Sequence, residues 1–260
     1  MSVLADILAS KRRELPELHA RPRQRSPRTP LDVAGALRRE GGPLRLIAEV
    51  KLRSPSGGAL SRALAPDARA LAYAEAGATV VSVLCDGPFF DGSWDHLAAV
   101  RARLDAAGLA VPLLAKEFVL DERQIAEARD RGADAVLLIA RIVDAARLKA
   151  LAQAARDEGL EPLVEVVDEA ELGAALAVGA RVVGVNARDL DSLAMDAARA
   201  VRVLDAIPAG VVAVHLSGLR TPADLQRVAR GRADAALVGE ALMRQDDPRA
   251  ALGAMVAAAR

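Results

Sequence analysis

The amino-acid sequence predicts an α/β fold, a closed barrel in which eight parallel strands alternate with eight helices. Short β-branched runs alternate with alanine-rich helical stretches, and this unit occurs eight times along 260 residues without a break in composition. An open, doubly wound sheet would normally carry a glycine-rich dinucleotide fingerprint after its first strand, but the sequence there reads KLRSPSGG. No Walker loop occurs either, so a single (β/α)8 barrel of the TIM type is favoured.

An N-terminal helical extension precedes the predicted barrel. Leu4, Ile7, Leu8 and Leu15 share one helical face, which predicts an amphipathic helix over residues 2–18 that docks on the main body. The Pro- and Arg-dense segment ARPRQRSPRTP follows and is the best candidate for a mobile linker.

A second short helix is expected just before the barrel. Thr29 is its predicted N-cap, with Pro30 in the first helical position and Asp32 in the first turn. Residues 1–45 are then the extension with its linker, and residues 46–260 are the barrel. The two parts are expected to form one domain together.

The eight strand–helix units are assigned from the change of hydrophobic period. The predicted strands cover residues 46–50, 80–84, 112–116, 135–139, 162–166, 181–186, 211–215 and 235–238. The predicted helices cover residues 66–77, 94–107, 121–131, 144–158, 168–178, 196–206, 221–230 and 247–258. Gly77, Gly132 and Gly179 are expected to end helices in the left-handed conformation.

Composition limits the classes of partner. The 35 basic and 35 acidic residues cancel and aromatic residues make up only 2%, which argues against nucleic-acid and anionic-membrane partners. A single cysteine excludes an intramolecular disulfide. No apolar run reaches about 18 residues, and the N-terminus lacks the apolar region of a signal peptide. We expect a cytoplasmic protein, and a monomer, although the sequence does not determine the oligomeric state.

Polar residues interrupt the apolar strands at the end where barrel active sites form. Glu49 and Lys51 share a face at the end of the first strand, and Lys116 ends the third. The fifth strand carries Glu165 among valines, and the sixth gives Asn186 and Arg188. Buried charges are costly, and lysines beside glutamates can hold one group ready to donate a proton while another accepts it. The pattern therefore predicts multistep acid–base chemistry.

The last two strands end in loops that suit an anion. Ser217 and Gly218 precede one helix and Gly239 precedes another, so backbone N–H groups there can bind a phosphate, with Ser54 and Lys51 closing the same pocket. We therefore expect a small phosphorylated substrate.

Other reactive residues are given structural roles. The three histidines, His19, His96 and His215, lack mutual ligand spacing, so no metal site is expected. His215 is predicted to point outward against a helix, and Cys85 to be a small buried residue without an activating histidine.

Several motifs, in order along nearly the whole chain, are similar to those of one enzyme family. They include IAEVKLRSPSGG, VLCDGPFFDGSWDHL, LLAKEFVLDERQIAEARDRGADAVLLI, LVEVVDEAEL, GVNARDL, SGLRTPADL and LVGEALMRQDDP. Together they resemble the indole-3-glycerol-phosphate synthase family of tryptophan biosynthesis. The resemblance implies cyclisation of 1-(2-carboxyphenylamino)-1-deoxyribulose 5-phosphate with loss of carbon dioxide and water and without a cofactor.

The same resemblance implies roles for the strand-end residues. Lys116 looks like the general acid for ring closure, and Glu165 like the group that stabilises positive charge on the anilino system. Glu49 and Lys51 look like the pair that serves dehydration. The implied substrate-binding residues are Asn186 and Arg188 for the sugar hydroxyls and the carboxylate, and Ser54, Ser217, Gly218 and Gly239 for the phosphate.

The chain departs from the family pattern at several positions, and the departure at Leu216 leaves alternatives open. The chain reads KEF where the family usually has Lys-Asp-Phe, and we expect Glu117 to point away from the cavity with little effect. It reads HLSG where the family has Ser-Glu-Ser-Gly, so Leu216 points inward in place of an active-site glutamate. The alternatives are a phosphate-binding barrel with an altered substrate, such as phosphoribosylanthranilate isomerase, and a non-catalytic binding partner.

Overall fold

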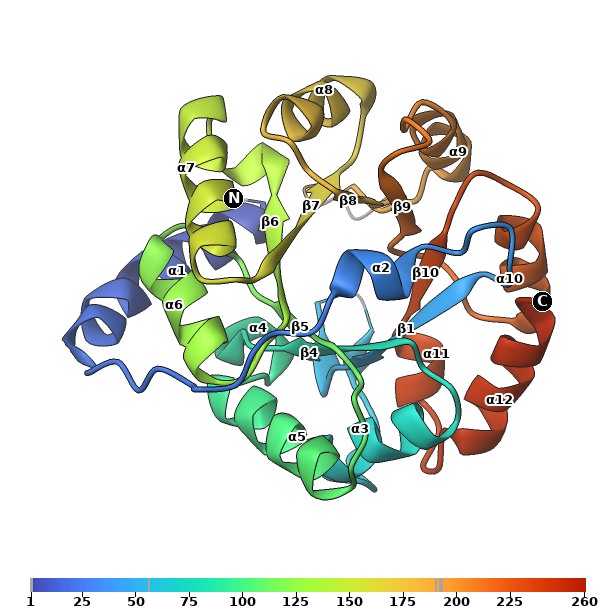
Figure 1. Ribbon diagram of the computed structural model, residues 1–260, viewed down its shortest axis with the longest axis horizontal. Helices are drawn as coiled ribbons and strands as arrows, with labels where there is room; N and C mark the ends of the chain where they lie inside the picture. The colour runs from blue at the N-terminus through green and yellow to red at the C-terminus, as the bar shows by residue number, and fades with distance from the viewer. Residues whose placement is uncertain (1, 56, 190, 192–193) are drawn as a thin grey trace.

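The computed structural model is a closed parallel barrel, which confirms the predicted fold class. It describes residues 2–55, 57–189, 191 and 194–260. The strands, in chain order, are β1 (Arg45–Val50), β4 (Val80–Leu84), β5 (Leu113–Lys116), β6 (Ala135–Ile139), β7 (Glu161–Val166), β8 (Val182–Val185), β9 (Val212–His215) and β10 (Ala235–Val238). Each pairs with the next in parallel, and β1 pairs with both β4 and β10, so the sheet has no free edge (Figure 1).

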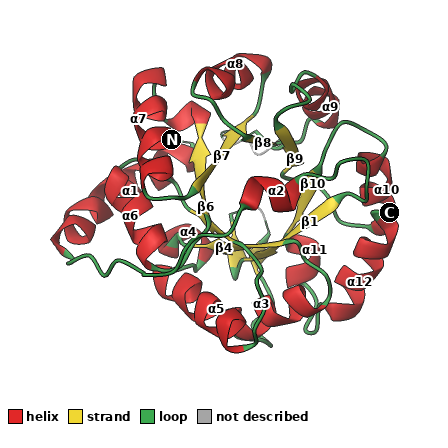
Figure 2. Ribbon diagram, viewed as in Figure 1, coloured by secondary structure: helices red, strands yellow, loops and turns green. Residues whose placement is uncertain are grey.

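Helices follow every barrel strand and surround the sheet (Figure 2). They are α3 (Pro66–Glu75), α5 (Trp94–Ala106), α6 (Glu122–Asp130), α7 (Ala145–Asp157), α8 (Glu169–Ala177), α9 (Ala197–Asp205), α10 (Pro222–Ala229) and α12 (Arg249–Ala258). The glycines at 77, 132 and 179 have positive φ angles after α3, α6 and α8, as predicted.

Short elements that the sequence did not indicate lie near the strand ends. They are the antiparallel pair β2 (Arg53–Ser54) and β3 (Gly58–Ala59), the helices α4 (Gly87–Phe90) and α11 (Glu240–Met243), and a 3-10 turn, η1 (Ala140–Ile142). Each spans only two to four residues, too few for a hydrophobic period to be recognised.

Alternate strand residues build two apolar layers. Ile47, Leu114, Leu137 and Leu163 belong to the cluster inside the barrel. Their sequence neighbours, such as Ala48 and Val164, belong to the cluster that includes the surrounding helices. This alternation explains why a charged residue at an inward position of a strand end faces the barrel axis.

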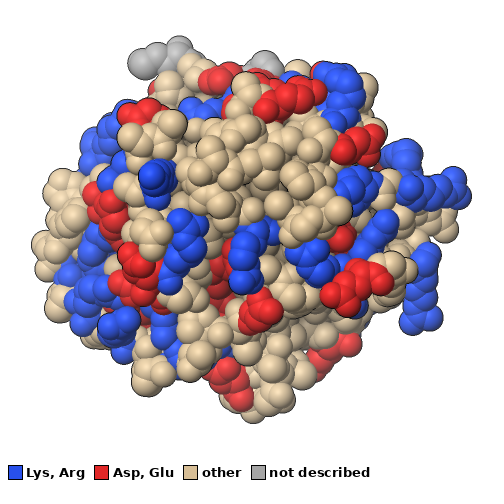
Figure 3. Space-filling view, turned by 45° about the horizontal axis from the view of Figure 1, so that its top comes forward, with Lys and Arg blue, Asp and Glu red and all other residues tan. Residues whose placement is uncertain are grey.

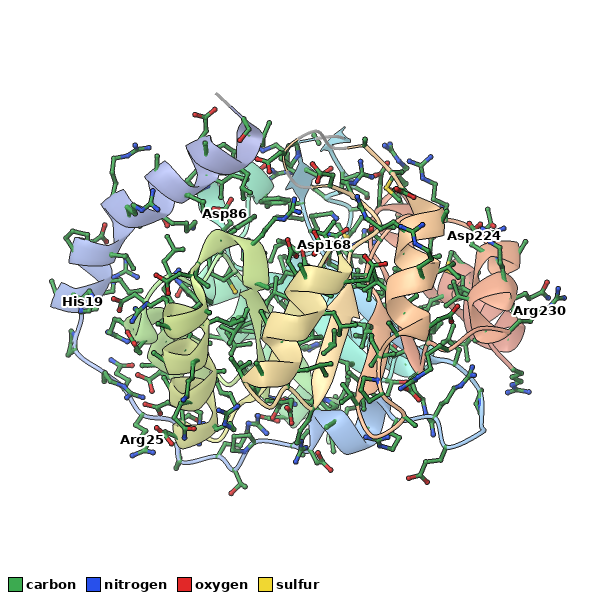
Figure 4. All side chains as sticks on the ribbon, turned by 90° about the horizontal axis from the view of Figure 1, so that it is seen from above. His19, Arg25, Asp86, Asp168, Asp224 and Arg230 are labelled. Carbon is green, nitrogen blue, oxygen red and sulfur yellow. The ribbon has the colours of Figure 1, made fainter. Side chains whose placement is uncertain are left out.

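The N-terminal extension reaches both ends of the barrel. Helix α1 (Val3–Ala20) crosses the face at the top of Figure 4, and α2 (Val33–Leu37) lies at the opposite face. Between them the chain runs along the side of the barrel. There Arg23 pairs with Asp130 and Glu158, and Arg28 pairs with Asp134. The segment predicted to be a mobile linker therefore makes several ion pairs with the barrel.

The predicted start of the second helix was wrong. Helix α2 begins at Val33, and Asp32 is its N-cap, because the Asp32 side chain accepts the N–H of Gly35 at 3.1 Å. The backbone N–H of Leu31 donates instead to Asp134 at 2.7 Å. Thr29 and Pro30 thus belong to the extended segment that precedes the helix.

Surface charge is mixed on the face shown in Figure 3, where basic and acidic side chains are interspersed. This distribution fits the balance of 35 basic and 35 acidic residues. Among the described residues, none of the helices combines the length and the apolar character needed to cross a membrane.

Candidate active site

One pocket at the C-terminal ends of the strands brings together all ten residues that the sequence singled out. They are Glu49, Lys51, Ser54, Lys116, Glu165, Asn186, Arg188, Ser217, Gly218 and Gly239. These residues come from strands or loops that are far apart in sequence, and only the closed barrel places them around one axis.

A chain of hydrogen bonds crosses this pocket from β5 to the loop after β9. Lys116 Nζ donates to Glu165 Oε2 at 3.3 Å, and Asn186 Nδ2 donates to Glu165 Oε1 at 2.9 Å. Ser217 Oγ then donates to Asn186 Oδ1 at 2.7 Å. Glu165 and Asn186 are buried, so this chain holds the lysine in one orientation.

Lys116 is held in its charged form. Burial by itself lowers the pKa of Lys116, but the negative charges of Glu165 and Glu49 outweigh burial, and the pKa lies above its usual value. A charged lysine at the pocket floor can donate a proton to a substrate oxygen, and in its resting state it is ready to do so at neutral pH.

Glu49 and Lys51 form a second, separate pair. Lys51 Nζ donates to Glu49 Oε1 at 2.6 Å. The other oxygen of the buried carboxylate, Glu49 Oε2, has no hydrogen-bond partner within the described part of the chain. Since a buried carboxylate oxygen is seldom left unpaired, this atom is available to a hydroxyl group of a bound molecule.

Gly239 is needed beside this pair. A Cβ atom at position 239 would lie 2.6 Å from Glu49 Oε1. A side chain there would therefore displace the Glu49 carboxylate, as well as occupying the path of an anion. The sequence predicted Gly239 only as part of an anion-binding loop, and the structure reveals its contact with Glu49.

Small residues form the end of the pocket that suits a phosphate. Ser54, Ser217, Gly218 and Gly239 all line it, and Gly218 has a φ of +85°, which a residue with a side chain rarely adopts. The structure adds two charged residues that sequence reasoning missed, Arg220 and Glu240. Glu240 directly follows Gly239 and Arg220 lies two residues after Gly218, and this closeness in sequence was the available signal.

Apolar side chains form another wall of the pocket. Phe90 and Phe118, whose rings lie 6.0 Å apart between centroids, face residues from the first turns of α1. The α1 residues are Val3, Leu4 and Ile7. The sequence predicted that this face of α1 docks on the body, but it contained no indication that the helix lines the site.

Leu216 points into the pocket, as expected from strand alternation. It is buried and packs in the barrel's inner cluster beside Leu163. A Cβ at Gly184 would lie 2.5 Å from Leu216 Cδ1, so the glycine on the adjacent strand makes room for the leucine. At this position the pocket therefore offers an apolar surface and no carboxylate.

The expectation for Glu117 needs revision. Its side chain is buried, lies 3.3 Å from Lys11 Nζ, and is among the residues that line the pocket. Burial, the largest influence, and the charge of Asp86 raise the pKa of Glu117 to about 7, although Lys11 and the N–H of Phe118 act in the opposite direction. Strand alternation alone could not reveal a buried partner from the distant helix α1.

This raised pKa predicts a pH-dependent stability difference. Folded Glu117 retains a proton that the unfolded chain releases between about pH 4.5 and 7, so raising the pH through this window costs folding free energy. Glu117→Gln cannot titrate and should gain about 1–3 kcal/mol relative to the parent between pH 5 and 7.5. Urea unfolding at both pH values measures the difference. Exposed Glu17→Gln is the control, and a Glu117→Gln difference that stays constant with pH would contradict the prediction.

The remaining reactive residues take structural roles. His215 is buried, and its pKa falls to about 4 because of burial and the charge of Arg227 on α10, which is consistent with its predicted outward direction. Burial raises the pKa of the Cys85 thiol well above its usual value. No group of three or more His, Cys, Asp or Glu residues suited to a metal ion occurs in the part of the chain that the structure describes.

The fold and the pocket together define a (β/α)8-barrel enzyme with acid–base groups that suit a small phosphorylated substrate. Comparison with known proteins gives the family. The family model described as indole-3-glycerol phosphate synthase matches residues 4–255, so the chain belongs to the indole-3-glycerol-phosphate synthase family, a family of carbon–carbon lyases of tryptophan biosynthesis.

Curated relatives agree over nearly their whole length. The indole-3-glycerol phosphate synthase of Streptomyces griseus is 43% identical over 265 aligned positions, covering 99% of this chain and 96% of the relative. The protein of the same name from Mycobacterium ulcerans is 44% identical over 229 positions, covering 88% and 82%.

Solved structures with lower identity share the fold alone. A 3-hexulose-6-phosphate synthase from Salmonella typhimurium is 15% identical with a TM-score of 0.64, covering 83% of this chain and 98% of that one. A thiamine phosphate pyrophosphorylase from Pyrococcus furiosus is 16% identical with a TM-score of 0.62, covering 83% and 95%.

Proposed function

We propose that this chain cyclises 1-(2-carboxyphenylamino)-1-deoxyribulose 5-phosphate to indole-3-glycerol phosphate, releasing carbon dioxide and water, and that the ten pocket residues carry the reaction. The observation that carries the proposal is the presence of two separate lysine–carboxylate pairs in one pocket, 2.6 Å and 3.3 Å between the paired atoms. Ring closure and dehydration each need a proton donor, and two pairs can serve them in turn.

Lys116 acts in ring closure. The ring carbon that bears the carboxylate attacks the sugar ketone, and Lys116 donates a proton to the ketone oxygen as the new carbon–carbon bond forms. Positive charge then develops on the anilino nitrogen, and the carboxylate of Glu165 stabilises it. Carbon dioxide leaves with its bonding electrons remaining in the ring, which restores aromaticity.

Glu49 and Lys51 act in dehydration. A proton leaves the carbon next to the nitrogen, and the hydroxyl formed in the first step departs as water after it receives a proton. The unpaired Glu49 Oε2 suits the first transfer and the Lys51 ammonium suits the second. Asn186 and Arg188 orient the sugar hydroxyls and the carboxylate, and the loops around Ser54, Ser217, Gly218 and Gly239 bind the phosphate.

The direct test is turnover. The purified chain is mixed with the carboxyphenylamino substrate and the appearance of indole fluorescence is followed, with product identity checked by mass. Formation of indole-3-glycerol phosphate supports the proposal. If the substrate binds and no product forms, the chain is a binding protein or uses another substrate.

Leu216 sets a further expectation for this activity. An inward glutamate could bind the substrate or a catalytic lysine, a charged interaction of about 1.5–3 kcal/mol, and leucine cannot provide it. We expect Leu216→Glu to raise kcat/KM about ten- to a hundredfold. The variant should also lose stability in urea, because the carboxylate would enter the apolar space beside Leu163 and Gly184. If the parent is fully active and Leu216→Glu is impaired, the reaction does not need a glutamate at this position.

We also propose that the chain is a cytoplasmic monomer without a nucleic-acid partner, and that residues 1–45 and 46–260 unfold as one domain. Within the described ranges, Met195 and Val201 are the exposed large apolar residues, which supports a surface without an extensive apolar patch. Light scattering at several concentrations measures the oligomeric state, and a dimer mass would refute the monomer.

A further inference from the structure

Lys11 is buried and lies outside the acid–base pairs of the proposed reaction. Its Nζ is 2.9 Å from Asp86 Oδ1 and 3.3 Å from Glu117 Oε1, and the side chains of the three residues are 2%, 0% and 1% exposed. A fourth group, the part-exposed Glu14, lies 2.8 Å from the same nitrogen. Buried ions are tolerated when they are paired, so this cluster constrains every segment that contributes to it.

The cluster joins α1 to the floor of the pocket on the β5 side. Glu117 follows Lys116 directly in the chain, and its Oε1 accepts the N–H of Phe118 at 2.7 Å. The Glu117 carboxylate therefore fixes the backbone between the proposed general acid and an aromatic pocket residue.

The cluster also joins α1 to the loop after β4. Asp86 is the N-cap of α4 and accepts the N–H of Phe89 at 2.8 Å, and α4 in turn presents Phe90 to the pocket. Figure 4 shows Asp86 beneath α1. Lys11 thus contacts both segments that supply the aromatic side chains of the pocket.

The part of α1 before Lys11 is the part that lines the pocket. Leu4 and Ile7 are seven and four residues before Lys11, so the three lie on one face of the helix. The far end of this segment is also tied down, because Ser2 Oγ donates to Asp191 Oδ1 at 2.9 Å. The two attachments hold the first two turns of α1 over the strand ends.

We propose that Lys11 is a positioning residue for the aromatic ring of the substrate: by neutralising Asp86 and Glu117 it holds the first turns of α1 as the apolar wall of the pocket. The inference rests on the proposed function. Removing Lys11 would leave Asp86 as a buried carboxylate without its cation, next to Glu117 and with Glu14 adding another carboxylate, and α1 would move away to hydrate them. The phosphate end would be spared, because its residues come from the loops after β1, β9 and β10.

The test compares Lys11→Met with the parent and with Lys149→Met, which removes an exposed lysine on α7. Two ligands are titrated by calorimetry: inorganic phosphate, and the substrate with its ketone reduced to an alcohol so that it cannot cyclise. Hydrogen exchange is measured over residues 3–10, together with kcat and KM.

We expect Lys11→Met to weaken binding of the reduced substrate and to raise KM at least about tenfold, with kcat changed less than about threefold. Phosphate binding should be unchanged, and amide exchange in residues 3–10 should accelerate. Adding Asp86→Asn should partly restore both KM and protection, because it removes the buried carboxylate that has lost its cation, while the amide oxygen can still cap α4.

Unchanged exchange in α1 would overturn the inference, as would an equal loss of affinity for phosphate and the reduced substrate. The exchange measurement does not depend on turnover, so a parent that forms no indole product would refute the proposed function alone. If Lys11→Met does not fold, Ile7→Ala leaves the ion cluster intact and removes only the wall, and an unchanged KM in that variant would overturn the inference.

Discussion

Replacing Lys116 with methionine is expected to lower kcat by ~10²–10⁴, which corresponds to about 3–5 kcal/mol of transition-state stabilisation. Methionine keeps the length of the side chain but cannot donate a proton to the ketone oxygen. KM should change much less, because the phosphate and the aromatic ring are bound by other residues. Steady-state indole fluorescence measures both constants.

The control for Lys116→Met is Lys149→Met, which should match the parent. Lys116→Met should also lower the stability of the fold, since among the described residues it leaves the buried Glu165 carboxylate with Asn186 as its hydrogen-bond partner. Urea unfolding separates this effect from catalysis. If a folded Lys116→Met enzyme turns over at the parent rate, Lys116 has no role in the reaction.

Glu165→Gln is expected to lower kcat by ~10²–10³, because the amide cannot stabilise positive charge on the anilino nitrogen. The variant should also alter the pH profile. Burial lowers the pKa of Lys116, and Glu165 is the largest of the charges that raise it, so removing this charge should lower the pKa. Lys116 acts in its protonated form, so the alkaline limb of kcat should move to lower pH.

The matched control is Glu169→Gln, an exposed position at the start of α8, the helix after the strand that carries Glu165. In a pH profile recorded from pH 6 to 10, the parent and Glu169→Gln should keep their kcat to the alkaline end of the range, because the pKa of Lys116 lies above its ordinary value of 10.5, whereas the kcat of Glu165→Gln should fall within the range. An alkaline limb that stays in place in Glu165→Gln would mean that the proton donor is a different group.

Local patterns in the sequence were sufficient to predict the barrel. The strands recur as β-branched runs and the helices as alanine-rich periods, and these signals depend on neighbours only a few residues apart. Each of the eight barrel strands begins and ends within one residue of its predicted bounds. The strand-end charges were recognisable for the same reason, since Glu49 and Lys116 interrupt runs of apolar residues.

Long-range contacts explain what the sequence could not reveal. Asp32 replaces Thr29 as an N-cap because Asp134, about a hundred residues away, binds the backbone before the helix. The buried ion pair of Glu117 was not predicted, because its partner Lys11 lies on α1, 106 positions earlier in the chain. The apolar wall from α1 was missed because docking of an amphipathic helix is predictable from its own sequence, whereas the surface on which it docks is not.

The path of the N-terminal extension also sets an order of assembly during synthesis. Residues that anchor it, among them Glu117, Asp130, Asp134 and Asp191, leave the ribosome long after α1 itself, so α1 can settle only after much of the barrel has been made. Until residue 191 has emerged, the apolar face of α1 has no complete surface to cover. In a nascent chain the apolar face of this amphipathic helix therefore stays uncovered while the barrel is being made. The pocket can bind the aromatic ring only after the barrel has closed and α1 has docked on it.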